Sequence, residues 1–553
     1  QPSEMAGKMR MGTGGPGMGG LLKDGYKHYS GLEEAVLQNV QAAKELSKIT
    51  RTSLGPNGLN KLIINHLEKI IVTSDASTIC SEMEVAHPAA KMLVMASSEQ
   101  QKAVGDGSNL VVSLAGELLS QAQDLLRMGV HPADIVVGYK LAAKRALAAV
   151  EKAVCKVMSA DELRDASQLA VALQSVVAAK HYGFEHVVAP LVAEAAVAAM
   201  PSAPRRPAIS VDNIRVAKLI GGSITDSQVL RGLVVLRDTE GTVKRADKAR
   251  VAVFGVGIEA ADTETKGTVV LKSADELKAF ARSEEETMEE VVKSLSDSGV
   301  TVVVSGGSIS EIAMHYLEKY SILVVKILSK FELRRICKVT GATALVRLGA
   351  PTEEEVGTCD SVVVQEISSR RVTVFQQDED DSRMATVVLR GATTSLLDDL
   401  ERAVDDAVHT AKTLCRDGRL VPGAGAVETA VSLDVQEFAS SVPGLEQYAI
   451  NKYAEAIEVV PRTLSENAGK DATDIMSALY AAHAEGKVTS GVDIDEGGVC
   501  DAEVAEIYDS CMAKLSAIRL ASDAAITVLR VDQIIMSKQA GGPKPREARP
   551  GDL

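Results

Sequence analysis

The strongest constraint on the fold is the order of helical and strand-forming segments along the chain. Apolar residues recur at helical spacing in "LEEAVLQNVQAAKEL", and the sequence from His87 to about Ala149 is also helical in pattern. The segments "AISVDNIRVAKLI", "RVAVFGVGI" and "TVVVSGG" are short and rich in β-branched residues, and they alternate with helical stretches. From about Met384 to about Val531 the pattern is again helical. This order predicts an α/β unit inserted into a helical domain.

Length and charge exclude several classes of protein. A chain of 553 residues is too long for one hydrophobic core, so several domains are expected. Its 46% hydrophobic and 24% charged residues are typical of a soluble globular protein. The net charge of −15, without a basic stripe, argues against nucleic acid as the main ligand. No apolar run is long enough to span a membrane, so we expect neither a nucleic-acid nor a membrane partner.

Neither the cysteines nor the two terminal segments contain a motif for a metal or catalytic site. The seven cysteines form no CxxC pair and the nine histidines are dispersed, which favours reduced thiols in a cytoplasmic protein over a His/Cys metal site. Residues 1–20 are rich in Gly and Met and predict a flexible arm. The segment "KQAGGPKPREARPGDL" is of low complexity and predicts a disordered tail.

The segment "KAVGDGSNLVV" places one carboxylate, Asp106, between two glycines at the start of a predicted helix. If Ser108 opens that helix, its first amides and the helix dipole favour a bound anion. Asp106 would repel a phosphate unless a cation such as Mg²⁺ lay between them. The segment is not a P-loop, because no GK[ST] follows. An ordinary capped helix start is the alternative.

Two further turns are candidates for ligand contact. The segment "SLGPNG", Ser53 to Gly58, contains glycines that allow a backbone to approach a ligand, although a helix-to-strand turn explains them equally well. Asp75 ends the predicted strand "KIIVTSD", and the simplest role for an aspartate there is to cap the next helix.

The helix "LLDDLERAVDDAVHTAKTL" has an apolar face, and most of its acids lie on the other face: Asp398, Asp399, Glu401, Asp405 and Asp406. A charged face of this kind is usually solvated, but one of these acids could orient a water molecule for hydrolysis. The segment "VPGAGAVE" follows, and its Gly423 and Gly425 would allow the backbone to lie against a nucleotide.

Taken together, these segments resemble the group II chaperonin family. The resemblance runs from Gly31 to Lys544 and is carried, in this order, by "TSLGPNGLNK", "VTSDASTI", "EVAHPAAKML", "VGDGSN", "LRGATTSLLDDLERAVDDAV", "VPGAGAVE" and "DAAITVLRVDQIIMSKQAGGPK". The stretches "INHLEK", "HPAAKMLVMAS" and "GLEQYAI" resemble one subunit type of the eukaryotic cytosolic chaperonin.

The resemblance implies a multi-domain chaperonin fold. An α-helical equatorial domain would comprise 21–155 and 416–540, and an α/β intermediate domain 156–220 and 381–415. An α/β apical domain would comprise 221–380, with a helical lid protrusion at about 255–290, and 541–553 would be a flexible tail. This division agrees with the order of segments described above.

The resemblance also implies roles for individual residues. Asp406 would act as the general base or water-orienting acid, Asp75 would help to place the water, and Asp106 would bind Mg²⁺. Client proteins would contact the helix "SKFELRRICKVTG", whose apolar set is Phe331, Leu333, Ile336 and Cys337, through the polar residues Lys330, Arg334, Arg335 and Lys338. The residues expected to bind the nucleotide are Leu54, Gly55, Pro56, Gly107, Ser108, Asn109, Leu110, Ala179, Lys180, Gly425, Asp493, Ile494, Asp509 and Lys514.

Three positions depart from the family pattern. Ala424 interrupts a run of glycines, and its Cβ could crowd the adenosine if that position needs glycine geometry. Ser108-Asn109 replaces a pair of threonines, and Ala76 stands where glycine is common. These departures suggest slow turnover, and they keep open a ring scaffold whose ATP site is vestigial.

The function implied is that of a cytoplasmic, ATP-driven folding machine. ATP and Mg²⁺, with K⁺ as a further candidate, would be its ligands, and hydrolysis would close a double-ring chamber around non-native proteins of the actin and tubulin class. Seven paralogous subunits would complete the ring, and a prefoldin-type co-chaperone could deliver clients. A homo-oligomeric ring and an ordinary metabolic ATPase or kinase are the alternatives, although no motif for a second small-substrate pocket is present.

Overall fold

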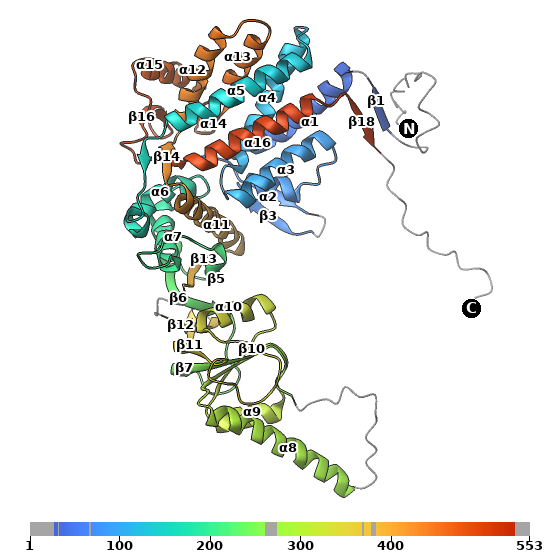
Figure 1. Ribbon diagram of the computed structural model, residues 1–553, viewed down its shortest axis with the longest axis vertical. Coiled ribbons are helices and arrows are strands. Elements are labelled where there is room, and N and C mark those ends of the chain that lie inside the picture. Colours follow the sequence, from blue (N-terminus) through green and yellow to red (C-terminus); the bar gives the residue numbers. More distant parts are fainter. Residues whose placement is uncertain are drawn as a thin grey trace, which may run out of the picture.

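The computed structural model describes residues 27–30, 32–65, 68–259, 274–367, 370–377 and 383–536. The predicted N-terminal arm, the tail and part of the predicted lid protrusion, 260–273, lie outside the described residues. The molecule is elongated: a helical region at one end is joined through a smaller middle region to a mixed α/β region at the other end (Figure 1). The chain leaves the helical region and returns to it, so both ends of the described chain lie there.

The helical region is built around α4, which packs against α1, α3, α13 and α16. Close approach is possible because small residues line these contacts: a Cβ on Gly116 of α4 would lie 2.2 Å from the Cβ of Ser47 on α1. The helices of this region are α1 (Leu32–Arg51), α2 (Ala76–Glu82), α3 (Pro88–Ala103), α4 (Ser108–Arg127), α5 (Pro132–Lys152), α12 (Ala426–Ser441), α13 (Glu446–Ile457), α14 (Val459–Asn467), α15 (Ala472–Ala484) and α16 (Cys511–Leu529).

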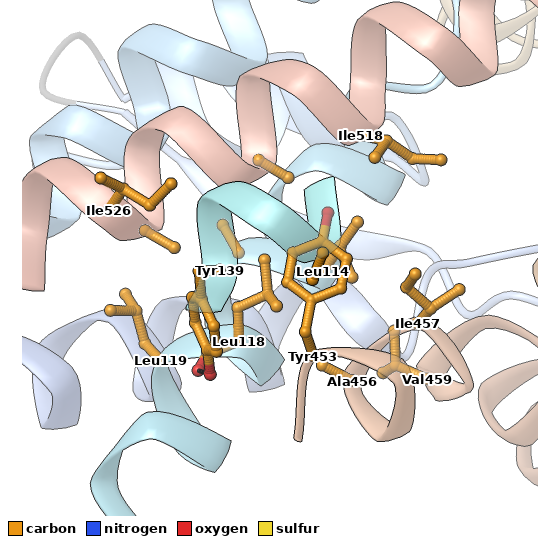
Figure 2. Packing of buried hydrophobic residues seen from close by; sticks show 14 of the residues in the cluster. Leu114, Leu118, Leu119, Tyr139, Tyr453, Ala456, Ile457, Val459, Ile518 and Ile526 are labelled. Carbon is orange, nitrogen blue, oxygen red and sulfur yellow. Dashed lines mark hydrogen bonds between the residues drawn. The ribbon is translucent and has the colours of Figure 1, made fainter. Parts of the chain in front are cut away.

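Two tyrosines lie at the centre of this core, surrounded by leucines and isoleucines (Figure 2). The rings of Tyr139 and Tyr453 meet edge to face at 5.5 Å. Both are fully buried, so each hydroxyl needs a partner. Tyr139 donates to the carbonyl of Leu118 at 2.7 Å, and the Tyr453 hydroxyl lies 2.7 Å from that of Ser522. These bonds connect α5 to α4 and α13 to α16.

Short β-ribbons surround the helices. Residues from the two ends of the described chain pair as β1 (Lys27–Ser30) and β18 (Gln533–Met536). The remaining small sheets combine β2 (Lys61–Ile64) with β3 (Ile70–Thr73), β15 (Ser490–Asp493) with β16 (Gly498–Asp501), and β14 (Arg419–Pro422) with β17 (Tyr508–Ser510) and β4 (Lys156–Val157).

The expectation of continuous helix after Met384 was therefore wrong in part. Strands interrupt it at β13 to β17. Strands β13, β14 and β17 pair with strands distant in sequence, which helical periodicity cannot reveal, and β15 and β16 form a local hairpin. In the helical stretch from His87 to Ala149, the break at "GDGSN" was predicted, but a second break was missed. Gly129 adopts a left-handed conformation with φ +90°, and Pro132 then starts α5.

The middle region has its own hydrophobic core, formed by two segments of the chain. Helices α7 and α11 pack on a parallel strand pair, β5 and β13, and α6 packs on these two helices. Its elements are η1 (Glu162–Arg164), α6 (Ala166–Ala178), α7 (Glu185–Ala199), η2 (Val211–Asn213), β5 (Ile214–Ile220), η3 (Ile224–Asp226), β13 (Ala385–Gly391) and α11 (Thr394–Arg416).

The third region continues the same sheet, in the order β5-β13-β6-β12-β11-β7-β8-β9, with β10 paired to β7. Alternate residues of β7 face opposite sides: Val251 and Val253 pack with α10, and Ala252 and Phe254 pack with α8 and α9. In Figure 1, α8 extends away from the sheet. The elements are β6 (Gln228–Val235), β7 (Arg245–Phe254), α8 (Ala274–Asp297), β8 (Val302–Ser305), α9 (Glu311–Lys319), β9 (Leu323–Lys326), α10 (Lys330–Thr340), β10 (Ala344–Leu345), β11 (Gly357–Ile367) and β12 (Arg370–Gln376).

Candidate functional site

A cavity of about 500 Å³ lies where the helical region meets α6 of the middle region. Its lining comes from segments far apart in sequence, including the turn after α1, the start of α4, the end of α6 and the β15–β16 ribbon. All fourteen residues predicted to bind the nucleotide line it, and so does Asp106. Asp75 and Asp406 do not line the cavity but lie directly behind Lys180, which does.

The start of α4 forms one wall of the cavity. Helix α4 begins at Ser108, as predicted, and Gly107 at its N-cap adopts φ +78° and has no side chain to satisfy the first amides. A Cβ on Gly107 would lie 3.2 Å from Gln100 Nε2, a tight contact that would require this side chain to shift slightly. Gln100 fixes this loop, because its amide donates to the carbonyls of Asp106 at 2.7 Å and Ala513 at 3.2 Å. The resulting row of unsatisfied amides can bind an anion.

The side chain of Asn109 is already occupied. Its amide donates to the carbonyl of Thr50 at 3.0 Å and to the Ser53 hydroxyl at 3.2 Å, while Ser113 donates to its Oδ1. Asn109 therefore attaches the start of α4 to the end of α1. Only its backbone amide remains to contact a phosphate.

Asp106 is a half-buried carboxylate at this wall. Burial, and then the neighbouring Asp509 carboxylate, raise its pKa above the ordinary value, although the amide of Gly107 donates to it at 2.6 Å. A divalent cation would remove this penalty. No group of three or more potential metal ligands occurs among the residues that the structure describes, so such a cation would need further oxygens from a bound phosphate or water.

Three charged side chains from three segments meet beside the cavity. Lys180 Nζ lies 2.7 Å from Asp75 Oδ1 and 3.2 Å from Asp406 Oδ2, and all three side chains are mostly buried. Asp75 caps α2, as the sequence suggested, by accepting from the amide of Thr78 at 2.8 Å. One carboxylate therefore belongs to the helical region and the other to α11, and the lysine bridges them.

The two carboxyls differ in their electrostatics. Burial would raise the pKa of Asp75, but the Lys180 ammonium and the bonds from Thr78 hold it well below its usual range. Burial raises the pKa of Asp406 to about 7 despite Lys180, because the Asp75 and Asp106 carboxylates are also near. Burial alone would lower the pKa of Lys180, but Asp75 and Asp406 raise it. One acid is thus held ionised while the other can accept a proton near neutral pH.

The acidic face predicted for α11 is divided in the structure. Lys218 pairs with Asp398 and Glu401, whereas Asp399 and Asp406 are buried against the helical region. Asp399 accepts from the hydroxyl of Thr73 at 2.9 Å and lies 3.2 Å from His181 Nε2.

The opposite wall of the cavity is formed around the β15–β16 ribbon. Ala424 adopts φ +53°, so this position does require glycine-like geometry, and alanine supplies it with strain. Lys514 pairs with Asp509 at 2.9 Å and with the buried Glu428. Asp493 accepts from the amides of Asp495 and Glu496, which shapes the ribbon's turn.

Sequence reasoning missed several residues of the site. The hydroxyl of Tyr182 donates to Asp495 at 2.9 Å, which connects the loop after α6 to the ribbon at the cavity. Gln101 donates to Asp406, and Thr73 to Asp399. Asp399 had been named among the acids of α11, and it lies two helical turns before Asp406 and so on the same face. Nothing in the sequence marks Gln101 or Thr73.

The residues predicted to contact clients lie far from this cavity, on α10 of the α/β region. Of the apolar set of this helix, Leu333 and Ile336 are buried, whereas Phe331 is 71% exposed. It lies near the start of α10, beyond the edge of the sheet-facing stripe. Lys330 and Arg334 are exposed, and Lys338 donates to the side chain of Asn213.

Comparison with known proteins identifies the family. The model of the TCP-1/cpn60 chaperonin family matches residues 46–539. The chain is similar to T-complex protein 1 subunit theta of Homo sapiens, with 49% identity over 532 residues, which cover 96% of each chain. It is 48% identical to that of Arabidopsis thaliana over 528 residues, 96% of each chain. For Dictyostelium discoideum the identity is 47% over 536 residues, 97% of this chain and 99% of the relative.

These matches extend over all three regions of the molecule, and they include the segments that line the cavity and the two acids of different pKa beside it. Within the described residues, no helix is both long and apolar enough to cross a lipid bilayer. The chain belongs to the TCP-1/cpn60 chaperonin family, has its multi-domain fold, and is an ATP-hydrolysing chaperone subunit.

Proposed function

We propose that this subunit binds ATP with Mg²⁺ in the cavity and hydrolyses it there. The phosphates would lie against the amides at residues 107–110, and the adenosine would lie toward Ile494 and Asp509. Asp106 would hold Mg²⁺, which neutralises phosphate charge when bound. K⁺ is proposed only as a further cation, and no residue is assigned to it.

The observation that carries the catalytic proposal is the bridge from Lys180 to Asp75 and Asp406. Asp406 orients the attacking water and accepts its proton, for which a pKa near neutrality is suitable. Asp75 remains ionised and helps to fix the water. Because Asp406 lies on α11 and Asp75 follows β3, the pair is complete only when the middle region is docked on the helical region.

We further propose that the helical, middle and α/β regions are the equatorial, intermediate and apical domains, with boundaries as predicted from the sequence. Movement of the intermediate domain onto the equatorial domain would then couple hydrolysis to closure of the chamber. Non-native clients of the actin and tubulin class would contact α10 at Lys330, Arg334 and Arg335, with Lys338 at the edge of that surface.

The partners proposed are seven paralogous subunits in a double ring, in the cytoplasm, with a prefoldin-type protein delivering clients. The exposed apolar side chains of the β2–β3 ribbon support the proposal of a neighbouring subunit. The ribbon is an isolated two-stranded sheet, yet Leu62, Ile64 and Ile70 are about 60% exposed on it. Such a ribbon is marginal alone and offers open edges for pairing with another chain.

The catalytic proposal is tested inside the native complex with a readout specific to this subunit, because the proposed paralogous subunits would also hydrolyse ATP. Tagged complex is incubated with 8-azido-ATP labelled on either the α- or the γ-phosphate and is then photolysed, and the band of this subunit is counted. The α label reports occupancy by nucleotide. The ratio of γ to α label reports the fraction not yet hydrolysed by this subunit.

Asp406→Ala is expected to keep its α label and to lose hydrolysis by about 100-fold or more, because the water loses its base. Asp398→Ala is the matched control: it removes an acid from the same helix that pairs with Lys218 outside the cavity. Normal loss of γ label in Asp406→Ala would refute the assigned role.

A further inference from the structure

Gln101 makes a direct contact with the proposed catalytic acid. It lies in the last turn of α3, and its amide Nε2 donates to Asp406 Oδ1 at 2.7 Å. Helix α3 belongs to the helical region and α11 to the middle region, so this bond joins the two bodies that must meet to complete the site.

The bond fixes the orientation of the Asp406 carboxylate. Lys180 contacts Oδ2 and Gln101 contacts Oδ1, so each oxygen has its own donor. Lys180 is shared with Asp75 and lines the cavity, where bound phosphates would also attract it. Gln101 carries no charge, and phosphates compete for it far less.

The bond to Asp406 accounts for the orientation of the Gln101 amide. Its Oε1 is buried and has no hydrogen-bond partner among the described residues. A rotated amide would place that oxygen against the carboxylate, where the two would repel. Leaving an acceptor unsatisfied costs free energy, and the charge-assisted bond to Asp406 offsets it.

We propose that Gln101 is a positioning residue for hydrolysis, which holds the Asp406 carboxylate in its working orientation when α11 docks on α3. The inference rests on the proposed role of Asp406. It predicts that loss of the amide slows the chemical step and leaves nucleotide binding unchanged, because Gln101 itself does not line the cavity.

The test is the double-label experiment on the native complex. Gln101→Met removes the donor but keeps the length of the side chain. We expect its α label to stay within about twofold of the unmodified subunit and its hydrolysis to fall at least tenfold. Gln101→Asn keeps the polar amide but withdraws it by one methylene, and a similar selective loss is expected if Gln101→Met fails to enter the ring.

Gln436→Met is the matched control, because Gln436 also donates an amide to a buried carboxylate, Glu458, at 3.2 Å, but away from the cavity. It should hydrolyse normally. Unchanged hydrolysis in both Gln101 variants would overturn the proposal, and so would parallel losses of α label and hydrolysis, which indicate a role in binding or folding. If Asp406→Ala also hydrolyses normally, the proposed catalytic role fails as well; if it does not, only the inference about Gln101 fails.

Discussion

Ala424, in the wall of the cavity, packs closely against Gly491 of β15. Ala424 adopts φ +53°, and the amide of Val492 donates to its carbonyl at 2.8 Å, which fixes this conformation. A Cβ on Gly491 would lie 2.8 Å from the Cβ of Ala424 and 3.0 Å from its carbonyl oxygen. The alanine found where glycine was expected is thus tolerated because the facing residue is glycine.

Gly491→Ala is therefore expected to destabilise this wall by about 1–3 kcal/mol, as overpacking does, and to lower the α label of this subunit. Adding Ala424→Gly should recover part of the label, because it removes the Cβ that the new methyl group would meet. Recovery should be incomplete, because the carbonyl oxygens of residues 423 and 424 still crowd the site. Gly498→Ala, in the same ribbon but with open space around the new methyl group, should bind nucleotide normally. Normal labelling of Gly491→Ala would contradict this account.

The sequence was informative about single residues where a short motif carries the chemistry. Asp75, Asp106 and Lys180 could each be named in advance, and they meet beside one cavity. Gln101 and Thr73 could not, because their importance comes from contacts across 305 and 326 positions of the chain. Such pairings depend on how two domains dock, and a local sequence pattern does not predict the docking.

Helix α11 shows the same limit for a secondary-structure element. Its periodicity correctly predicted one apolar and one acidic face. It did not predict that some acids of the acidic face would be buried against the helical region while others remain outside it. Helix α10 shows it again, because Phe331 fits the apolar pattern yet lies beyond the sheet that covers Leu333 and Ile336. Periodicity gives the faces of a helix, whereas the extent of its partner decides which residues are covered.

The exposed side of α10 tests the client-binding proposal. Arg334→Glu with Arg335→Glu reverses two charges on this side, and we expect the tagged complex to capture several-fold less denatured actin, measured by co-purification. Arg245→Glu is the control, since Arg245 is an exposed arginine of β7 that pairs with Asp247. Phe331→Ser measures the apolar share of the contact. If the charge-reversed variant captures actin normally and only Phe331→Ser loses capture, the contact is apolar and the proposed polar contact is wrong.

For the complete subunit, the order of segments was the most reliable guide. A helical region interrupted by an α/β insertion was expected from the sequence, and the described chain returns to its starting region through β18, which pairs with β1. Of the small ribbons, the strand before Asp75 was predicted and the others were missed. The ribbons are short: β15–β16 packs on α14 and α15, whereas β2–β3 exposes apolar side chains that the described part of this chain does not cover.

A neighbouring subunit is the occupant proposed for the β2–β3 ribbon, and assembly tests it. Native complex purified through a tag should have a mass on the order of a megadalton and contain several related chains, as expected for stacked rings. Leu62→Lys with Ile64→Lys places two charges on the exposed face of the ribbon, where they would be buried at an interface at high cost. We expect this variant to remain outside the complex, whereas Val504→Lys, at an 82% exposed site away from the ribbon, should assemble. Particles made of this chain alone would contradict the mixed ring and indicate a homomeric one. Normal incorporation of the ribbon variant would exclude the ribbon as a subunit contact.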